Sequence, residues 1–123
     1  MARHPRRPRG LAAASEHART VHAAAATLLD GGELAGLERV QKVVCEPTRA
    51  QIIRALGVGP LSVQDLAHLL NRPQPATSQH LRVLRQVGVV EVEPRGRQCY
   101  YHLSAGPVAA AVARLLANVA RAT

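Results

Sequence analysis

The chain has 123 residues, a length that suits one domain with a modest core plus tails. Its 16 Lys and Arg residues against 8 Asp and Glu give a formal net charge of +8. Such an excess points to a polyanionic partner, with nucleic acid first and an anionic membrane surface second. No apolar run approaches the roughly 20 residues of a membrane span, so we predict a cytoplasmic protein with no membrane partner.

Cysteines and aromatic residues exclude further classes. Cys45 and Cys99 form no CxxC pair, which excludes a disulfide framework and a four-cysteine zinc site. The two aromatic residues, Tyr100 and Tyr101, are adjacent. They are too few for the stacking platforms of single-strand binders, which leaves double-stranded DNA as the favoured partner.

The first half of the chain predicts a tail and three helices. Residues 1–14 combine four arginines with two prolines and a glycine, which is typical of a flexible basic arm. Apolar residues at helical spacing predict a helix from Ser15 to about Asp30, ended by Gly31 and Gly32. Further helices are expected over 33–44 and 47–56, the last with Pro47 in its first turn.

The stretch 62–88 predicts a helix-turn-helix. Ser62 and Asp65 have the spacing of a capping box and start a helix to Leu70, and 71–73 form the turn. The second helix should run from about Pro75 to Gln86 or Val87 and end at Gly88. Its wheel separates a packing face from a free polar face. The packing face holds Thr77, Leu81 and Leu84, and the free face holds Pro75, Ser78, Gln79, Arg82 and Gln86.

The last third predicts a wing and a closing helix. Residues 89–93 and 97–103 have strand character, and Pro94, Arg95 and Gly96 should form the turn between them. From Pro107 onward an apolar stripe predicts a final helix. The fold class is therefore mainly α with a small β-hairpin, a winged helix-turn-helix over 15–123 with flanking N- and C-terminal helices.

Four stretches carry a family resemblance. They are KVVCEPTRAQIIRAL (42–56), LSVQDLAHLL (61–70), PATSQHLRVLRQVGVV (75–90) and GRQCYYHL (96–103). In these stretches the sequence resembles the ArsR/SmtB family of bacterial winged-helix transcriptional repressors. The resemblance implies a homodimer that represses transcription from an inverted-repeat operator and leaves the DNA when an effector binds.

In that family the first and last helices form the dimer. The apolar stripes of this chain suit such a role, because each stripe needs a partner. The alternative is that both stripes pack within one subunit. The candidate dimer residues are Val21, Ala25, Leu28, Val108, Val112, Leu115 and Val119.

The resemblance also suggests how DNA is contacted. The recognition helix should present Gln74, Pro75, Ser78, Gln79, His80 and Arg82 to the major groove. Arg95 and Arg97 on the wing suit phosphates or the minor groove. The wheel turns His80 partly inward, so a helix-packing histidine is its alternative.

The family's metal sites are not expected here. Members that sense soft metals often carry CVC before the recognition helix, and Ser62 and Gln64 stand at those cysteine positions. Zinc-type members place Asp, His and Glu ligands on the last helix, but residues 104–123 contain none of these types.

Several effectors therefore remain open. Cys45 and Cys99 suggest a redox or thiol switch, although both positions resemble ordinary buried cysteines. A transition metal such as nickel or zinc has candidate ligands in His17 and His22, and a free amino terminus with His4 also binds copper or nickel. An organic effector, or no effector at all, is also compatible with the sequence.

Two other functional classes compete with a regulated repressor. An enzyme is not expected, because no HExxH, GxSxG or phosphate-binding glycine loop occurs. The stronger competitor is an effector-independent DNA-binding or architectural protein, or a repressor regulated by a partner protein.

Overall fold

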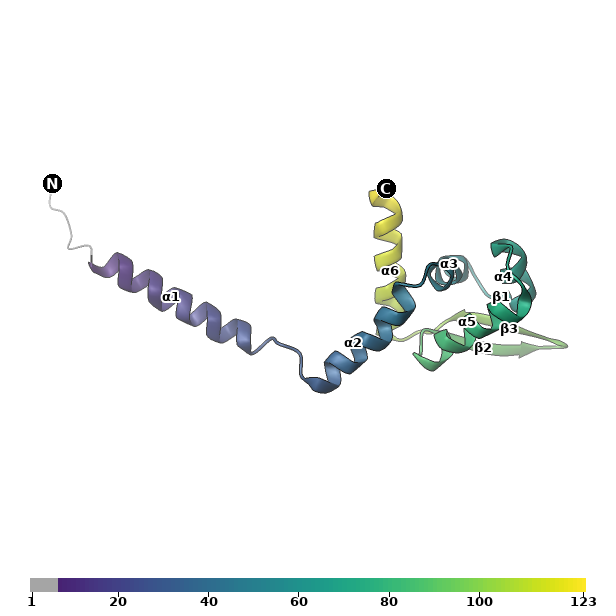
Figure 1. Cartoon of the computed structure of the whole chain (residues 1–123), viewed down its shortest axis with the longest axis horizontal. Helices are drawn as coiled ribbons and strands as arrows, with labels where there is room; N and C mark the ends of the chain where they lie inside the picture. The colour runs from purple at the N-terminus through teal and green to yellow at the C-terminus, as the bar shows by residue number, and fades with distance from the viewer. Residues whose placement is uncertain (1–6) are drawn as a thin grey trace. The chain divides into compact units, whose positions relative to one another are not determined.

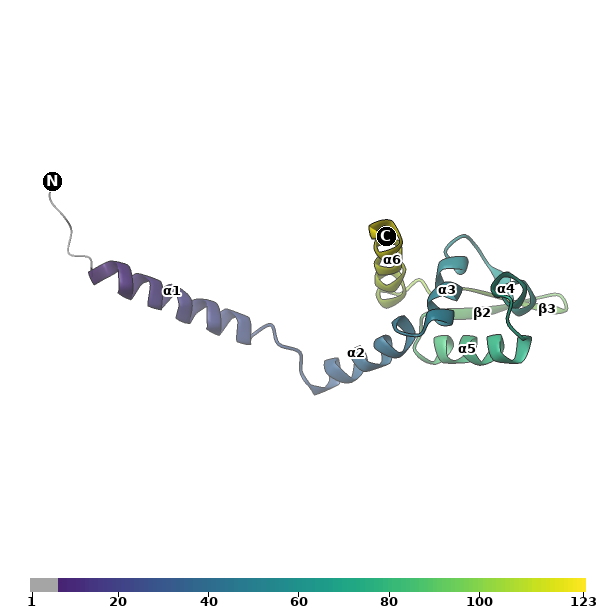
Figure 2. The same cartoon turned by 45° about the horizontal axis from the view of Figure 1, so that its top comes forward.

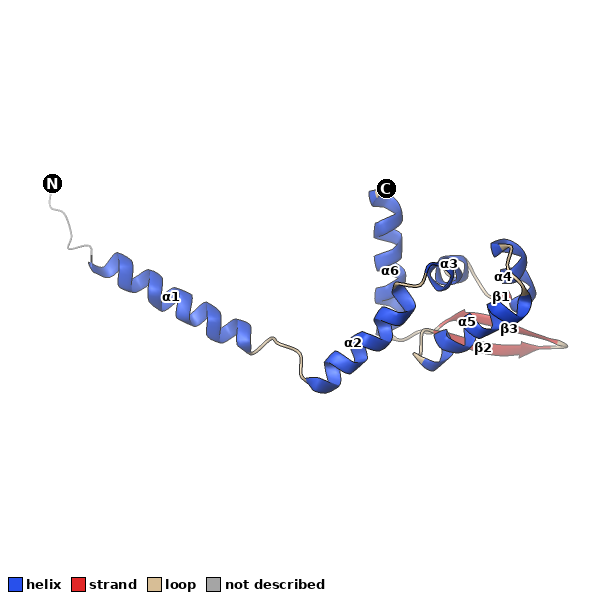
Figure 3. Cartoon of the chain, in the orientation of Figure 1, coloured by secondary structure: helices blue, strands red, loops and turns tan. Residues whose placement is uncertain are grey.

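The computed structural model describes residues 7–123, with side chains from residue 12 onward (Figures 1 and 3). The described residues fall into two compact units, one up to Ala35 and one over Gly36–Thr123. The elements in chain order are α1 (Arg7–Ala25), α2 (Gly31–Val44), α3 (Pro47–Leu56), β1 (Leu61–Ser62), α4 (Val63–Leu70), α5 (Gln74–Gln86), β2 (Val90–Arg95), β3 (Gln98–Leu103) and α6 (Pro107–Ala122).

The first unit holds α1, which differs from its predicted bounds at both ends. It begins at Arg7 rather than Ser15, so the part of the predicted flexible arm over 7–14 is corrected to helix. Pro8 falls in the first turn, where a proline suits a helix, and the alanines that follow are strong helix formers. Residues 1–6 of the predicted arm lie outside the described residues.

The start of α2 corrects the predicted role of its two glycines. Gly31 and Gly32 begin α2 instead of ending α1. The cause is a reciprocal cap: Asp30 Oδ1 accepts from the Glu33 amide (2.8 Å), and Glu33 Oε1 accepts from the Asp30 amide (2.9 Å). These bonds satisfy donors that the first helical turn leaves free, so the helix begins directly after Asp30.

The second unit has one apolar core with α3 at its centre. Helix α3 packs against α4, α5, α6 and β3, as Figure 2 helps to follow. The apolar faces of α4, α5 and α6 thus pack on α3, which supports α5 from the core side. The core residues are Val43, Ile52, Ile53, Leu56, Leu66, Leu81, Leu84, Val89, Val90, Ala109 and Val112.

The wing belongs to a three-stranded antiparallel sheet in the order β1-β3-β2, rather than to the predicted two-stranded hairpin. β1 was missed because two residues are too few to show alternation. The hairpin register pairs Arg95 with Gln98, so the turn consists of Gly96 and Arg97 instead of residues 94–96. Pro94 is tolerated within β2 because β2 is an edge strand, and Gly96 accommodates a φ of 62°.

The described helices were compared with the length and apolar character of a membrane span. Within residues 7–123, no helix combines the length and apolar character that crossing a bilayer requires.

Candidate nucleic-acid interface

The helix-turn-helix is anchored by the capping box that the sequence predicts. Ser62 Oγ accepts from the Asp65 amide (3.1 Å), and Asp65 Oδ2 accepts from the Ser62 amide (2.9 Å). The hydrogen bond from the Ser62 backbone is the main cause that lowers the pKa of Asp65, and the hydrogen bond with the Ser62 side chain is the second. At the other end of α4, Asn71 takes the left-handed conformation (φ 52°) and turns the chain toward α5.

Helix α5 packs by the face that its wheel predicts. Thr77, Leu81 and Leu84 are buried, which confirms the inward set. The Thr77 hydroxyl donates to the carbonyl of Pro73 (3.0 Å), so its polar group is satisfied inside the core. α5 begins one residue earlier than predicted, at Gln74.

The opposite face of α5 is exposed and carries side chains that can recognise bases. An amide such as Gln79 can bond adenine at two atoms, a guanidinium such as Arg82 can bond guanine, and the Ser78 hydroxyl can bond either. α5 contains no acidic residue, so nothing on it repels phosphate. The exposed residues of this face are Gln74, Pro75, Ser78, Gln79 and Arg82.

His80 is the exception among the predicted recognition residues. Its side chain is only 24% exposed, and its Nδ1 lies 3.2 Å from Nη1 of Arg49 and 3.7 Å from Oε2 of Glu46. Glu46 caps α3, and Arg49 lies in its first turn. This geometry favours the helix-packing alternative over a base contact.

The wing arginines differ in their surroundings. Both Arg95 and Arg97 are exposed near the hairpin tip. The Arg95 guanidinium lies 5.1 Å from the centroid of the Tyr100 ring, and its Nη2 lies 3.7 Å from Glu93 Oε2. Arg95 is therefore held along the strand by a cation–π contact and an exposed ion pair. The sequence alone did not predict these two partners of Arg95. The strand register places Tyr100 of β3 opposite Glu93 of β2.

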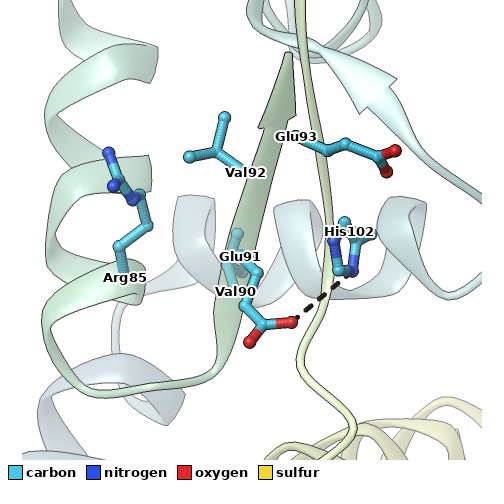
Figure 4. Close-up of a pocket in the computed structure, with 6 residues that line it drawn as sticks. All are labelled: Arg85, Val90, Glu91, Val92, Glu93 and His102. Atoms are coloured by element: carbon cyan, nitrogen blue, oxygen red, sulfur yellow. Dashed lines mark ion pairs between the residues drawn. The ribbon is translucent and has the colours of Figure 1, made fainter. Parts of the chain in front are cut away.

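An open hollow of about 510 Å³ lies between α5 and the wing (Figure 4). Within it, Glu91 Oε2 lies 3.9 Å from His102 Nδ1, the pair marked by a dashed line. Its carboxylates would repel phosphates, so we expect the DNA-facing surface to stop before this hollow. The lining residues are Arg85, Val90, Glu91, Val92, Glu93 and His102.

Both cysteines are exposed, which corrects the expectation of buried thiols. Cys45 follows directly after α2, in the turn that leads to α3. Cys99 has the register of an inward strand residue, but it pairs with Pro94 close to the hairpin tip, where both residues are exposed.

The candidate metal ligands are not gathered into a site. His17 and His22 are exposed on α1, and His4 lies outside the described residues. Among the described residues, no group of three or more His, Cys, Asp and Glu side chains could hold a metal ion. The two positions at which the family carries thiolates have other tasks: Ser62 caps α4, and Gln64 Oε1 accepts from Gln98 Nε2 (3.3 Å).

The predicted dimer residues of α6 separate into two groups. Val108, Leu115 and Val119 are exposed, whereas Val112 is 3% exposed and belongs to the core. Val112 therefore fits the alternative of packing within one subunit. On the N-terminal side, Val21 and Ala25 are exposed on α1, and Leu28 is exposed but lies beyond the end of that helix.

Comparison with known proteins agrees with this geometry. Residues 46–92, which run from the cap of α3 into β2, match the family model described as bacterial regulatory protein, arsR family. The transcriptional repressor SdpR of Bacillus subtilis is 32% identical over 68 residues, which is 55% of this chain and 76% of SdpR. The chain belongs to the ArsR family of bacterial regulatory proteins.

Two further relatives define how far the likeness extends. The transcriptional regulator NmtR of Mycobacterium tuberculosis is 37% identical over 75 residues, and the match spans 61% of this chain but only 62% of NmtR. A homodimeric winged helix-turn-helix DNA-binding domain from Mycobacterium bovis superposes with a TM-score of 0.64 at 30% identity, covering 79% of this chain and 88% of that structure. Membership of the ArsR family confirms the predicted fold class and a DNA-binding regulator rather than an enzyme.

Proposed function

We propose that this ArsR-family chain is a homodimeric repressor that binds an inverted-repeat operator in double-stranded DNA. The observation that carries the proposal is the exposed face of α5, where Ser78, Gln79 and Arg82 stand opposite the buried Thr77, Leu81 and Leu84. α5 would enter the major groove, and Arg97 and Arg95 would contact backbone or minor groove beside it. Such a protein acts on the chromosome, in the cytoplasm.

The dimer would be built from the exposed apolar residues of α6 and α1. Val108, Leu115 and Val119 form an exposed apolar row on α6, and water is a poor environment for such a row. Two copies related by a two-fold axis would place two α5 helices on half-sites about one helical turn apart, roughly 34 Å.

Selection of duplex DNA from a random-sequence pool tests this function. The full chain should recover an inverted repeat with half-sites about 10 base pairs apart. A protein–DNA complex of two chains per duplex, measured by light scattering, is expected with it. Recovery of unrelated sequences, with affinity set by salt alone, would contradict sequence-specific repression.

A second candidate is a DNA-binding protein that responds to no effector or only to a partner protein. The engagement of Ser62 in the α4 cap and of Gln64 with Gln98 favours it, because the family's thiolate positions are occupied by structural bonds. A sensor would instead use nickel or zinc at His17, His22 or His4, or a reaction at Cys45 or Cys99.

Titration of the selected complex separates the two candidates. Nickel, zinc, peroxide and a thiol-alkylating reagent are added in turn, and the fraction of bound duplex is measured by fluorescence anisotropy. Release of DNA by any of them identifies a sensor, and Cys45→Ser, Cys99→Ser, His17→Ala and His22→Ala then locate the site. Unchanged binding throughout supports the effector-independent function.

A further inference from the structure

Arg49, which the DNA-binding face does not include, joins three helices. It lies in the first turn of α3, and its Nη2 donates to the carbonyl oxygen of Lys42 in the last turn of α2 (2.7 Å). Its Nη1 lies 3.2 Å from Nδ1 of His80 in α5. Its Nε is buried with no hydrogen-bond partner among the described residues. The guanidinium is therefore held between these helices by the two bonds of its terminal nitrogens.

The chemistry of the pair fixes its direction. A guanidinium can only donate, so Nδ1 of His80 must accept and the ring proton must reside on Nε2. The Glu46 carboxylate, 3.7 Å from the same Nδ1, is also an acceptor and cannot bond an accepting nitrogen. It caps α3 instead, accepting from the Arg49 amide (2.7 Å). Arg49 is thus the partner that can donate a hydrogen bond to Nδ1 of His80.

The bond has a consequence for the neighbouring residues of α5. His80 directly follows Ser78 and Gln79, so the direction of its ring is linked to theirs by the helix geometry. The buried Leu81 and Leu84 hold α5 against the close-packed core, and a hydrogen bond adds a directional restraint, because it weakens steeply as its angle departs from linear. The Arg49–His80 bond therefore restrains the rotation of α5 about its own axis.

We propose that Arg49 is a positioning residue for DNA recognition, acting through Nδ1 of His80 to set the rotation of α5. Arg49 thereby decides which base edges Ser78 and Gln79 reach. The inference rests on the proposed function, because it needs a chain that discriminates between DNA sequences.

The test uses two substitutions that differ in where they place an acceptor. His80→Asn puts an amide oxygen close to the position of Nδ1, and His80→Gln puts it near the position of Nε2. Arg49→Lys is a third variant, which keeps the charge but cannot donate to Lys42 and His80 in the same fork geometry. Dissociation constants of the full-length proteins are measured on the duplex selected by the wild-type chain and on a scrambled duplex.

We expect His80→Asn to keep the wild-type ratio of the two dissociation constants. The discrimination is the dissociation constant on scrambled DNA divided by that on the selected duplex. His80→Gln and Arg49→Lys should lower this ratio by about tenfold, a loss the size of one good base contact. Affinity for scrambled DNA and its salt dependence should stay unchanged in all three, because the phosphate contacts remain. A residue that only stabilised the fold would lower both affinities together with the melting temperature.

Three results would overturn the inference. One is an equal ratio for His80→Gln and His80→Asn, and another is a parallel loss of both affinities with reduced melting temperature in all variants. The third is a wild-type chain that selects no sequence, which removes the proposed function as well. In the first two cases the wild-type protein still discriminates, so the proposed function stands while the role of Arg49 falls.

Discussion

At the scale of single residues, we expect discrimination between DNA sequences to depend on a few exposed side chains of α5. Gln79 is exposed and its amide can donate and accept at once, which matches the edge of adenine. Gln86 carries the same amide at the other end of α5 and is also exposed, but the N-terminal half of a recognition helix enters the groove. Gln86 therefore serves as a matched control for Gln79, with the same side chain at a position that is not expected to enter the groove.

Gln79→Ala should relax the preference at one base pair by about 1–3 kcal/mol and leave binding to scrambled DNA unchanged. Competition with duplexes that vary one position at a time measures this preference. Gln86→Ala serves as the control and should keep the wild-type preference. A uniform loss across all duplexes, or the same loss in both variants, would argue against a base contact by Gln79.

The contacts of Arg95 give a second test at this scale. Its ion pair with Glu93 is exposed and worth about 0.2–1 kcal/mol, so freeing it should raise affinity for any duplex by up to about fivefold. Glu93→Gln breaks this pair. Glu91→Gln removes the same charge from the same face of β2. Glu91 lies beside His102 and not beside Arg95, so this substitution should change affinity less. Fluorescence anisotropy at low salt compares them, and an equal rise in both would assign the effect to net charge.

At the scale of elements, the stability of α4 depends on its cap. The helix has eight residues, too few to be stable in isolation, so the reciprocal bonds of Ser62 and Asp65 matter more than they would in a long helix. Ser62→Ala should cost about 1 kcal/mol of unfolding free energy.

The cap also predicts a pH dependence. The Ser62 bonds lower the pKa of Asp65 below its unfolded value, so their contribution is present above the unfolded pKa and is lost as the pH falls through the folded pKa. The free energy of unfolding in urea should therefore differ between wild type and Asp65→Asn at pH 7, and this difference should disappear below about pH 4. Circular dichroism at both pH values measures it. A difference that stays constant with pH would mean that the charged carboxylate is not the stabilising form.

At the scale of the whole molecule, the proposed repressor requires two copies of the chain, because one α5 would contact one half-site. Leu115 is exposed in the single chain, whereas Val112, three residues before it on α6, is part of the core. A substitution at Leu115 can therefore test association without emptying the core, and one at Val112 cannot.

Leu115→Glu should convert the dimer to a folded monomer, because the introduced charge would be buried at the apolar seam. Its affinity for a full inverted repeat should fall toward that for a half-site. Ala110→Glu adds the same charge at another exposed position of α6, far around the helix from Leu115, and should stay dimeric. Light scattering gives the mass of each variant, and a dimeric Leu115→Glu would place the interface elsewhere.

Local patterns predicted the central elements because their causes are local. The α4 capping box, the buried face of α5 and the end of α5 before the left-handed Gly88 follow from spacing and backbone conformation. The Asp30–Glu33 cap is equally local, but the two glycines between these residues predict a helix end, which conceals the cap in the sequence.

The sequence by itself determined the order of the helices, the helix-turn-helix and the basic charge, because helical period, caps and net charge need no knowledge of distant contacts. The resemblance to the ArsR/SmtB family added the expectation of a double-stranded DNA partner. Only the tertiary structure decided which of those residues are free to act. The packing of α3 against α5 brings Arg49, 31 positions away in the chain, onto His80, and the sheet register brings Tyr100 beneath Arg95. The same long-range packing buries Val112 and exposes both cysteines, since burial depends on which segments meet and not on the residues adjacent in sequence.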